Sequence, residues 1–202
     1  MSRFSQAISE GDGISIVPVL EGHVEELAAL ATAAGAEAVA VAGPDVRRAR
    51  DNTPLPVLAR AGDPQAASAD GADACVLVVA ELDDDERLED LHALARDLGL
   101  DCAVDVRDEE ELERALERID PDIVLISERD LDNGEEDLER TLDLLADVPA
   151  GKLVISEAHI VTREQVVALE RAGVDAVVVE GLANPDFSVA LEELVRGSGA
   201  HR

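Results

Sequence analysis

Short apolar runs alternate with longer amphipathic stretches along the whole chain. Eight runs have the length of a strand, and they cover residues 14–20, 36–42, 55–61, 74–80, 102–106, 122–128, 152–158 and 175–181. Several follow a turn residue and an acidic residue, as in AGAEAVAVAG and AGVDAVVVEG. Uniformly apolar runs rich in Val, Ile and Ala predict parallel strands that are buried on both faces.

Helical periodicity fills most of the segments between these runs. It predicts helices over 23–34, 86–99, 108–120, 134–147, 162–172 and 186–196. The connections 44–54 and 62–73 are short and weakly helical, so we expect their helices to be reduced to about one turn. Strands that alternate with helices indicate βαβ units and a parallel sheet.

The regular repeat favours an α/β fold of the (β/α)8 TIM-barrel type over an open doubly wound sheet. Glu21-Gly22-His23 follows the first strand, where a dinucleotide-binding sheet carries a glycine-rich loop. The pattern predicts one compact barrel domain over 1–202. We expect 1–12 and 197–202 to be loose ends.

The charge balance excludes some classes of partner. Asp and Glu number 46 against 17 Lys and Arg, which gives a formal net charge of −29. Such a field repels nucleic acid and anionic membrane surfaces. Acidic chains of this kind stay soluble in concentrated salt, so we expect a halophilic, cytoplasmic protein. Cys75 and Cys102 lie in apolar runs and are predicted to be buried thiols of a reducing compartment.

The active site of a barrel lies at the carboxyl ends of its strands. The predicted strand ends carry Arg60, Asp105, Ser127, Glu157 and Glu180. If the three carboxylates point inward, they would repel one another and raise one pKa, or recruit Arg60 as a counter-ion. They would then form a candidate general acid/base set. The alternative is that some of them face solvent in the loops.

Two other kinds of site are weaker. Glu21, His23, Asp105, Glu157 and His159 could supply oxygen and nitrogen ligands, but their spacing matches no known metal signature, so we expect neither a metal nor a cofactor.

A phosphate site after strands seven and eight would use Gly181 and Asn184, although Glu180 and Asp186 would repel an anion. His92 lies in a predicted helix and is expected to be solvated.

Residues 86–181 resemble the indole-3-glycerol-phosphate synthase family. The resemblance is carried by LGLDCAVDVRDEEELERALE, ISERDLDNGEEDLERTLDLLADVP and LVISEAHIVTREQVVALERAGVDAVVVEG. It implies the same barrel and a lyase of tryptophan biosynthesis.

The family's lysines are missing from the matching positions. The resemblance aligns Pro18 and Leu20 with the family's Glu and Lys at the end of strand one, and Arg60 with its general-acid Lys after strand three. Arginine stays protonated and does not donate readily. The only lysine, Lys152, begins strand seven and so lies at the opposite end of the barrel.

The acidic positions are partly kept. The resemblance matches Asp105 to the strand-five Glu, Ser127 to the strand-six Asn and Glu157 to the strand-seven Glu, whereas Glu180 replaces the phosphate-binding Gly of strand eight.

Three hypotheses stay open at this point. On the first hypothesis, the chain is a diverged paralogue that binds a small molecule, such as a phosphorylated metabolite, or a protein partner. Alternatively, it is an active indole-3-glycerol-phosphate synthase, or a related lyase or isomerase, that uses Asp105, Glu157 and Arg60. Thirdly, it is a metal-dependent enzyme. A homodimer through 44–73 is also predicted.

Overall fold

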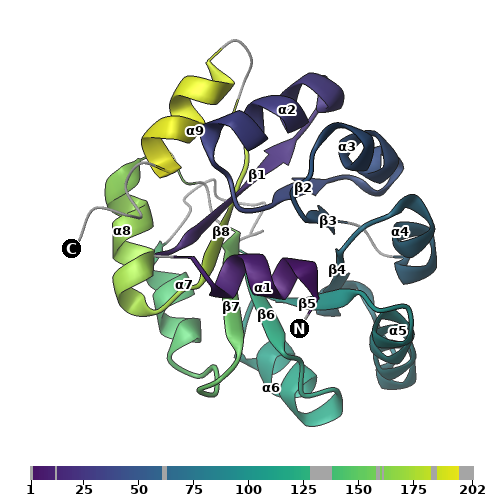
Figure 1. Ribbon diagram of the computed structural model, residues 1–202. Coiled ribbons are helices and arrows are strands. Elements are labelled where there is room, and N and C mark those ends of the chain that lie inside the picture. Colours follow the sequence, from purple (N-terminus) through teal and green to yellow (C-terminus); the bar gives the residue numbers. More distant parts are fainter. Residues whose placement is uncertain are drawn as a thin grey trace.

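Eight parallel strands close into a barrel in the order in which they follow along the chain (Figure 1). The computed structural model describes residues 2–11, 13–60, 63–127, 138–157, 160, 162–182 and 186–195. The strands are β1 (Ser15–Leu20), β2 (Val39–Val41), β3 (Val57–Ala59), β4 (Ala74–Val78), β5 (Asp101–Val106), β6 (Ile123–Ser127), β7 (Leu153–Glu157) and β8 (Ala176–Val179). The predicted barrel is confirmed.

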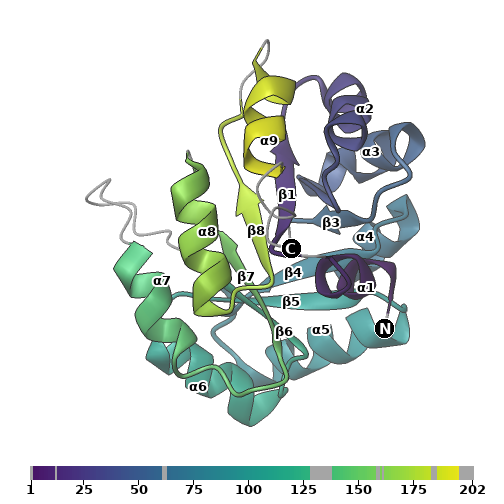
Figure 2. The same cartoon turned by 60° about the vertical axis from the view of Figure 1, so that its left-hand side comes forward.

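The helices form the outer ring of the barrel. The long ones are α2 (Val24–Ala34), α5 (Asp85–Asp97), α6 (Glu109–Arg118), α7 (Leu138–Leu145), α8 (Arg163–Ala172) and α9 (Phe187–Val195). Figure 2 shows that α7, α8 and α9 follow one another along one side of the molecule. All six predicted helices are present.

The two short connections carry more helix than the sequence predicts. Helices α3 (Val46–Asn52) and α4 (Pro64–Asp70) have 7 residues each, so they make about two turns where one was expected. Short 3₁₀ turns, η1 (Gly43–Asp45) and η2 (Val79–Glu81), follow β2 and β4. In α4, the Asp63 carboxylate caps the first turn, and Gly71 ends the helix in the left-handed conformation.

The N-terminal segment is ordered, and the expectation of a loose end is wrong for the residues that the structure describes. Helix α1 (Arg3–Ser9) lies across one opening of the barrel (Figure 1). Phe4 is fully buried and Ile8 nearly so, and both pack against the inner residues of the strands. The carboxylate of Asp101, at the start of β5, accepts the backbone N–H of Ser5 at 2.6 Å. The cause is the apolar face of α1, which closes the bottom of the barrel. Residues 197–202 lie outside the described part of the chain.

The acidic residues before the strands tie neighbouring strands together. Glu37 Oε2 accepts the backbone N–H of Ile16 at 2.9 Å, and Asp175 Oδ2 accepts that of Val154 at 2.7 Å. Asp73 Oδ2 likewise accepts the backbone N–H of Val57, at the start of β3, at 2.9 Å. Burial raises the pKa of the Glu37 and Asp175 carboxyls. The acidic residue of the repeated sequence pattern is therefore a structural element at the bottom of the barrel.

Alternate residues of the strands form two apolar layers. One set fills the barrel and consists mostly of Ala, Val and Ile, while the other set faces the helices. Cys75 and Cys102 belong to the outer layer and are buried, as predicted. His92 is also buried, at 8% exposure, because α5 turns it toward the barrel; the expectation of a solvated side chain is wrong.

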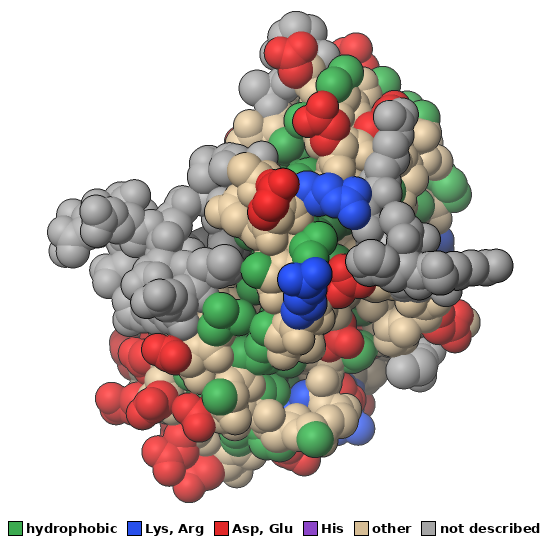
Figure 3. Space-filling model, turned by 90° about the vertical axis from the view of Figure 1, so that its left-hand side faces the viewer, with side chains coloured by type: hydrophobic (Ala, Val, Ile, Leu, Met, Phe, Trp, Pro, Cys, Tyr) green, Lys and Arg blue, Asp and Glu red, His purple; other side chains and the backbone are tan. Residues whose placement is uncertain are grey.

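Acidic side chains gather at the lower edge of the face shown in Figure 3, where Lys and Arg are few. Within the described residues, no helix is long and apolar enough to cross a membrane.

Candidate functional site

Five polar side chains meet at the mouth of the barrel, by which we mean the opening at the carboxyl ends of the strands. Each follows, two positions later, a residue that packs inside the barrel, so strand alternation aims it toward the axis. These residues are Arg60, Asp105, Ser127, Glu157 and Glu180. Of the two arrangements that the sequence left open, the structure has the inward-facing one, although the side chain of Glu180 is still 47% exposed.

Arg60 spans the mouth from β3 to the opposite side. Its Nη2 donates to Glu157 Oε1 and to Glu180 Oε1. The side chains of Arg60 and Glu157 are only 15% and 7% exposed, whereas that of Glu180 is 47% exposed. The Nε of Arg60 is buried and has no hydrogen-bond partner among the described residues. Arg60 is thus the counter-ion of the acidic cluster.

Asp105 and Ser127 form a second pair on neighbouring strands. Ser127 Oγ donates to Asp105 Oδ1 at 2.5 Å. Both residues are buried: Ser127 is 3% exposed and Asp105 is 1% exposed. A hydroxyl that donates to a buried carboxylate stabilises its charged form. This pair joins the ends of β5 and β6.

The loop after β5 is fixed to the next helix. Arg107 donates its backbone N–H to Glu111 Oε2 at 2.9 Å, and Asp108 Oδ1 accepts the backbone N–H of Glu111 at 2.9 Å. Burial raises the pKa of Glu111. These reciprocal bonds at the start of α6 hold the end of β5, and with it Asp105, in place.

The β1 side of the mouth is apolar. Val17 and Val19 lie in the inner layer, while Leu20 lies in the outer layer against the helices. Leu20, which the resemblance aligns with the family's Lys, therefore faces the helices, and the side chains that β1 turns inward are those of Val17 and Val19. Because a shift of one residue reverses the face of a strand, only the pairing of strands could decide which side chains point inward.

The one lysine is at the other end of the barrel. Lys152 Nζ donates to Asp120 Oδ1 at 2.6 Å and to the carbonyl of Pro121 at 2.9 Å. It lies just before β7, as predicted. No amine of this chain's side chains is available at the mouth, since the sequence has no other lysine.

The alternative sites receive less support. Glu21 and His23 are exposed in the loop after β1, and His159 lies outside the described residues. Across the ranges that the structure describes, no group of three His, Cys, Asp or Glu side chains is placed to hold a metal ion. Of the candidate phosphate ligands, Asn184 lies outside the described residues, and Gly181 is exposed with a φ of 71°.

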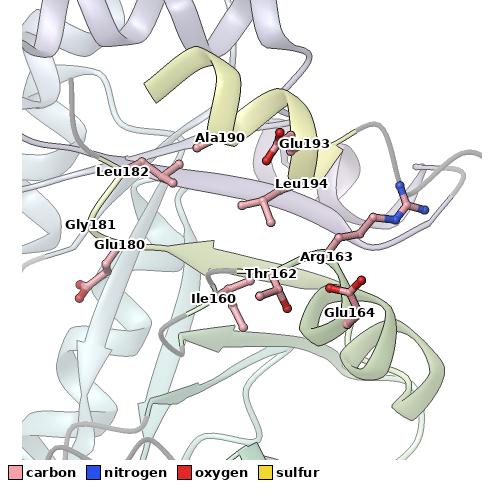
Figure 4. Close-up of a pocket in the computed structure, with 10 residues that line it drawn as sticks. All are labelled: Ile160, Thr162, Arg163, Glu164, Glu180, Gly181, Leu182, Ala190, Glu193 and Leu194. Carbon is pink, nitrogen blue, oxygen red and sulfur yellow. The ribbon is translucent and has the colours of Figure 1, made fainter. Parts of the chain in front are cut away.

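A cavity that the sequence did not reveal adjoins the mouth. It measures about 680 Å³ and lies between the start of α8, the end of β8 and α9 (Figure 4). Glu180 belongs to both the mouth and the cavity. The only sequence signal for it was the pair of segments after strands seven and eight, because the packing of α8, β8 and α9 against one another, and not a local pattern, creates the space.

Solved structures of low sequence similarity share this fold. A thiamine phosphate pyrophosphorylase from Pyrococcus furiosus superposes with a TM-score of 0.70 at 19% identity, covering 92% of this chain and 95% of that one. A mutant tryptophan synthase alpha-subunit from Pyrococcus furiosus has a TM-score of 0.70 at 17% identity, covering 90% of this chain and 98% of that one. These likenesses concern the barrel alone.

Sequence relatives are more specific. An indole-3-glycerol phosphate synthase of Variovorax paradoxus is 40% identical over 139 residues, which are 66% of this chain and 52% of that protein. One of Albidiferax ferrireducens is 38% identical over 156 residues, which are 74% of this chain and 58% of that protein. The chain spans little more than half the length of these relatives. The model of the indole-3-glycerol phosphate synthase family matches residues 63–194, and this chain therefore belongs to that family.

Proposed function

We propose that this chain is a diverged family member that has lost the family's lyase reaction and binds a small molecule at the mouth of its barrel. The observation that carries the proposal is Arg60. It occupies the position that the resemblance assigns to the general-acid lysine, and its guanidinium is held by Glu157 and Glu180.

The chemistry of the side chain gives the reason. Ring closure with decarboxylation needs a group that gives a proton to the substrate and takes one back. A guanidinium is strongly basic and keeps its protons at ordinary pH. With valines at the inner positions of β1, no second amine replaces it.

An active lyase, the function of the family in tryptophan biosynthesis, is the second candidate. The observation in its favour is that Asp105, Ser127 and Glu157 all face the mouth from the strands where the resemblance places catalytic residues. In that case Glu157 would act as the general base and Arg60 would bind an anionic group of the substrate.

Turnover separates the two candidates. The purified protein is assayed for formation of indole-3-glycerol phosphate at about 0.15 M and at about 2 M KCl, so that lack of salt does not hide activity. We expect a rate at least about 1000-fold below that of a family relative, within the usual contribution of a general acid. A relative's rate, abolished by Glu157→Gln, would contradict the proposal and support the active lyase.

Binding is measured separately, through thermal stabilisation by candidate ligands. A phosphorylated metabolite is the ligand class that the family suggests. Among the described residues whose side chains strand alternation aims into the mouth, Asp105, Glu157 and Glu180 supply carboxylates and Arg60 supplies a guanidinium, a balance that argues against an anion. The same proposal places the protein in a reducing, salt-rich cytoplasm, and its acidic composition supports this location.

A further inference from the structure

The cavity beside the mouth has an apolar floor. Three residues form this floor: Ile160 and Leu194, which are 1% and 3% exposed, and Leu182. Figure 4 shows these side chains between Glu180 at one end and Arg163 and Glu164 at the other. A volume of about 680 Å³ is in the range of cavities that bind small organic molecules.

The charged residues of the wall are mostly acidic. Among the described residues that line the cavity, Glu164, Glu180 and Glu193 are acidic and Arg163 is basic. Glu180 is shared with the mouth, where Arg60 already holds it. The resemblance implies a family phosphate site in this region, and here the surroundings repel a phosphate. An anionic ligand would lose its hydration and gain a carboxylate neighbour.

We infer that this cavity binds a small organic cation, an ammonium group carried by an apolar body. The apolar floor buries the body, and a carboxylate of the wall other than that of Glu180, which Arg60 holds, receives the ammonium; the candidates are Glu164 and Glu193. The inference rests on the proposed function, because a ligand phosphate held at this place is what the family reaction would need. It names the class of ligand that the diverged site accepts.

The apolar floor distinguishes this site from general attraction of cations to an acidic surface. An inorganic cation gains nothing from Ile160, Leu182 and Leu194, whereas each buried methylene of an alkyl chain contributes about 0.8 kcal/mol, which is roughly a fourfold gain in affinity. Affinity should therefore depend both on the head group and on the length of the chain.

Three probes with one apolar body test the head group. Hexylammonium, hexan-1-ol and hexyl phosphate are titrated into the whole protein, and binding is followed by calorimetry and by the shift of Tm. The titrations are run at about 0.15 M and about 1 M KCl, where the Debye length falls from about 8 Å to about 3 Å. We expect saturable binding of hexylammonium at both salt concentrations, at least about tenfold tighter than that of hexyl phosphate.

Single-site variants test whether hexylammonium binds in this cavity. Glu164→Gln and Glu193→Gln should each weaken hexylammonium binding about threefold to tenfold, since each removes one carboxylate from the wall. Glu110→Gln removes the same charge from exposed α6 and should leave the affinity unchanged. Equal losses in all three variants would show attraction by net charge alone and would overturn the inference.

Its failure is distinguishable from that of the proposed function. Tighter binding of hexyl phosphate, or no binding of any probe, overturns the organic-cation site and leaves the loss of the lyase reaction standing. Formation of indole-3-glycerol phosphate at a relative's rate overturns the proposed function, whichever probe binds.

Discussion

At the scale of single residues, Arg60 organises the mouth of the barrel. Its guanidinium joins β3 to the ends of β7 and β8 through Glu157 and Glu180. A carboxylate as deeply buried as Glu157 is costly unless a cation accompanies it. Arg60, which the resemblance aligns with the family's lysine, thus has a structural role.

Removing Arg60 should therefore destabilise the protein. We expect Arg60→Met to lower the free energy of unfolding by about 3 kcal/mol, because it leaves Glu157 buried without its cation. Glu180→Gln, which removes the more exposed partner, should cost less than about 1 kcal/mol. Urea unfolding of the three proteins in molar KCl measures both values. Similar small losses in the two variants would show that Glu157 does not depend on Arg60.

At the scale of elements, the bottom of the barrel is closed by contacts between distant segments. Helix α1 covers the bottom opening through Phe4 and Ile8, and carboxylates before the strands bind the backbone of their neighbours. The bottom therefore supplies stability, whereas the proposed ligand site lies at the opposite end. This division is usual for barrels.

The contribution of α1 can be measured at one side chain. Phe4→Ala removes a fully buried ring from the barrel and should cost about 3–5 kcal/mol of unfolding free energy. Gln6→Ala, on the exposed face of the same helix, should change it by less than about 0.5 kcal/mol. A loss near zero for Phe4→Ala would mean that α1 does not hold the barrel closed in solution.

The carboxylates at the strand starts make stability depend on pH. Burial raises the pKa of Glu37 above its ordinary value of 4.5, so the folded protein binds this proton more tightly than the unfolded chain does. That stabilising contribution is complete below pH 4.5 and is lost as the pH rises through the raised pKa.

Glu37→Gln removes this proton, and its amide oxygen can still accept the N–H of Ile16. The unfolding free energy of the variant minus that of the wild type should therefore increase between about pH 4 and about pH 7. Chemical unfolding at a series of pH values measures the difference. If it stays constant or falls, the buried carboxyl does not have the raised pKa.

At the scale of the whole molecule, the net charge of −29 is the main reason to expect that stability depends on salt. Self-repulsion opposes folding, and salt screens it. We expect Tm to rise by at least about 5 °C between about 0.1 M and about 2 M KCl. Sucrose at equal osmolality favours the compact state without screening charge, so it should give a smaller rise. Equal effects of the two solutes would argue against a halophilic adaptation.

The homodimer through 44–73 stays a prediction. It was expected because weakly helical connections leave apolar surface exposed. Among the described residues, the exposed large hydrophobic side chains are Leu98 and Val189, and both lie outside that segment. Size-exclusion chromatography in molar KCl tests the dimer directly.

The sequence by itself determined the barrel. Period-2 and period-3.6 patterns are local properties, and they were strong enough to place all eight strands, the six long helices and the strand ends that carry Arg60, Asp105, Ser127 and Glu157. The chemistry of the mouth followed from those residue types, because the carboxyl ends of parallel strands must meet at one opening.

Only the tertiary structure decided which face each side chain takes and which distant segments meet. The inward face of β1 and the docking of α1 depend on strand pairing and on packing partners far along the chain. His92, by contrast, lies on the face of α5 that Leu88, Leu91 and Ala95 already mark at helical spacing. The cavity beside Glu180 has walls from the consecutive elements α8, β8 and α9, and only their packing in space creates it. Such contacts leave no periodic signal, because they depend on shape and burial, which a local pattern does not encode.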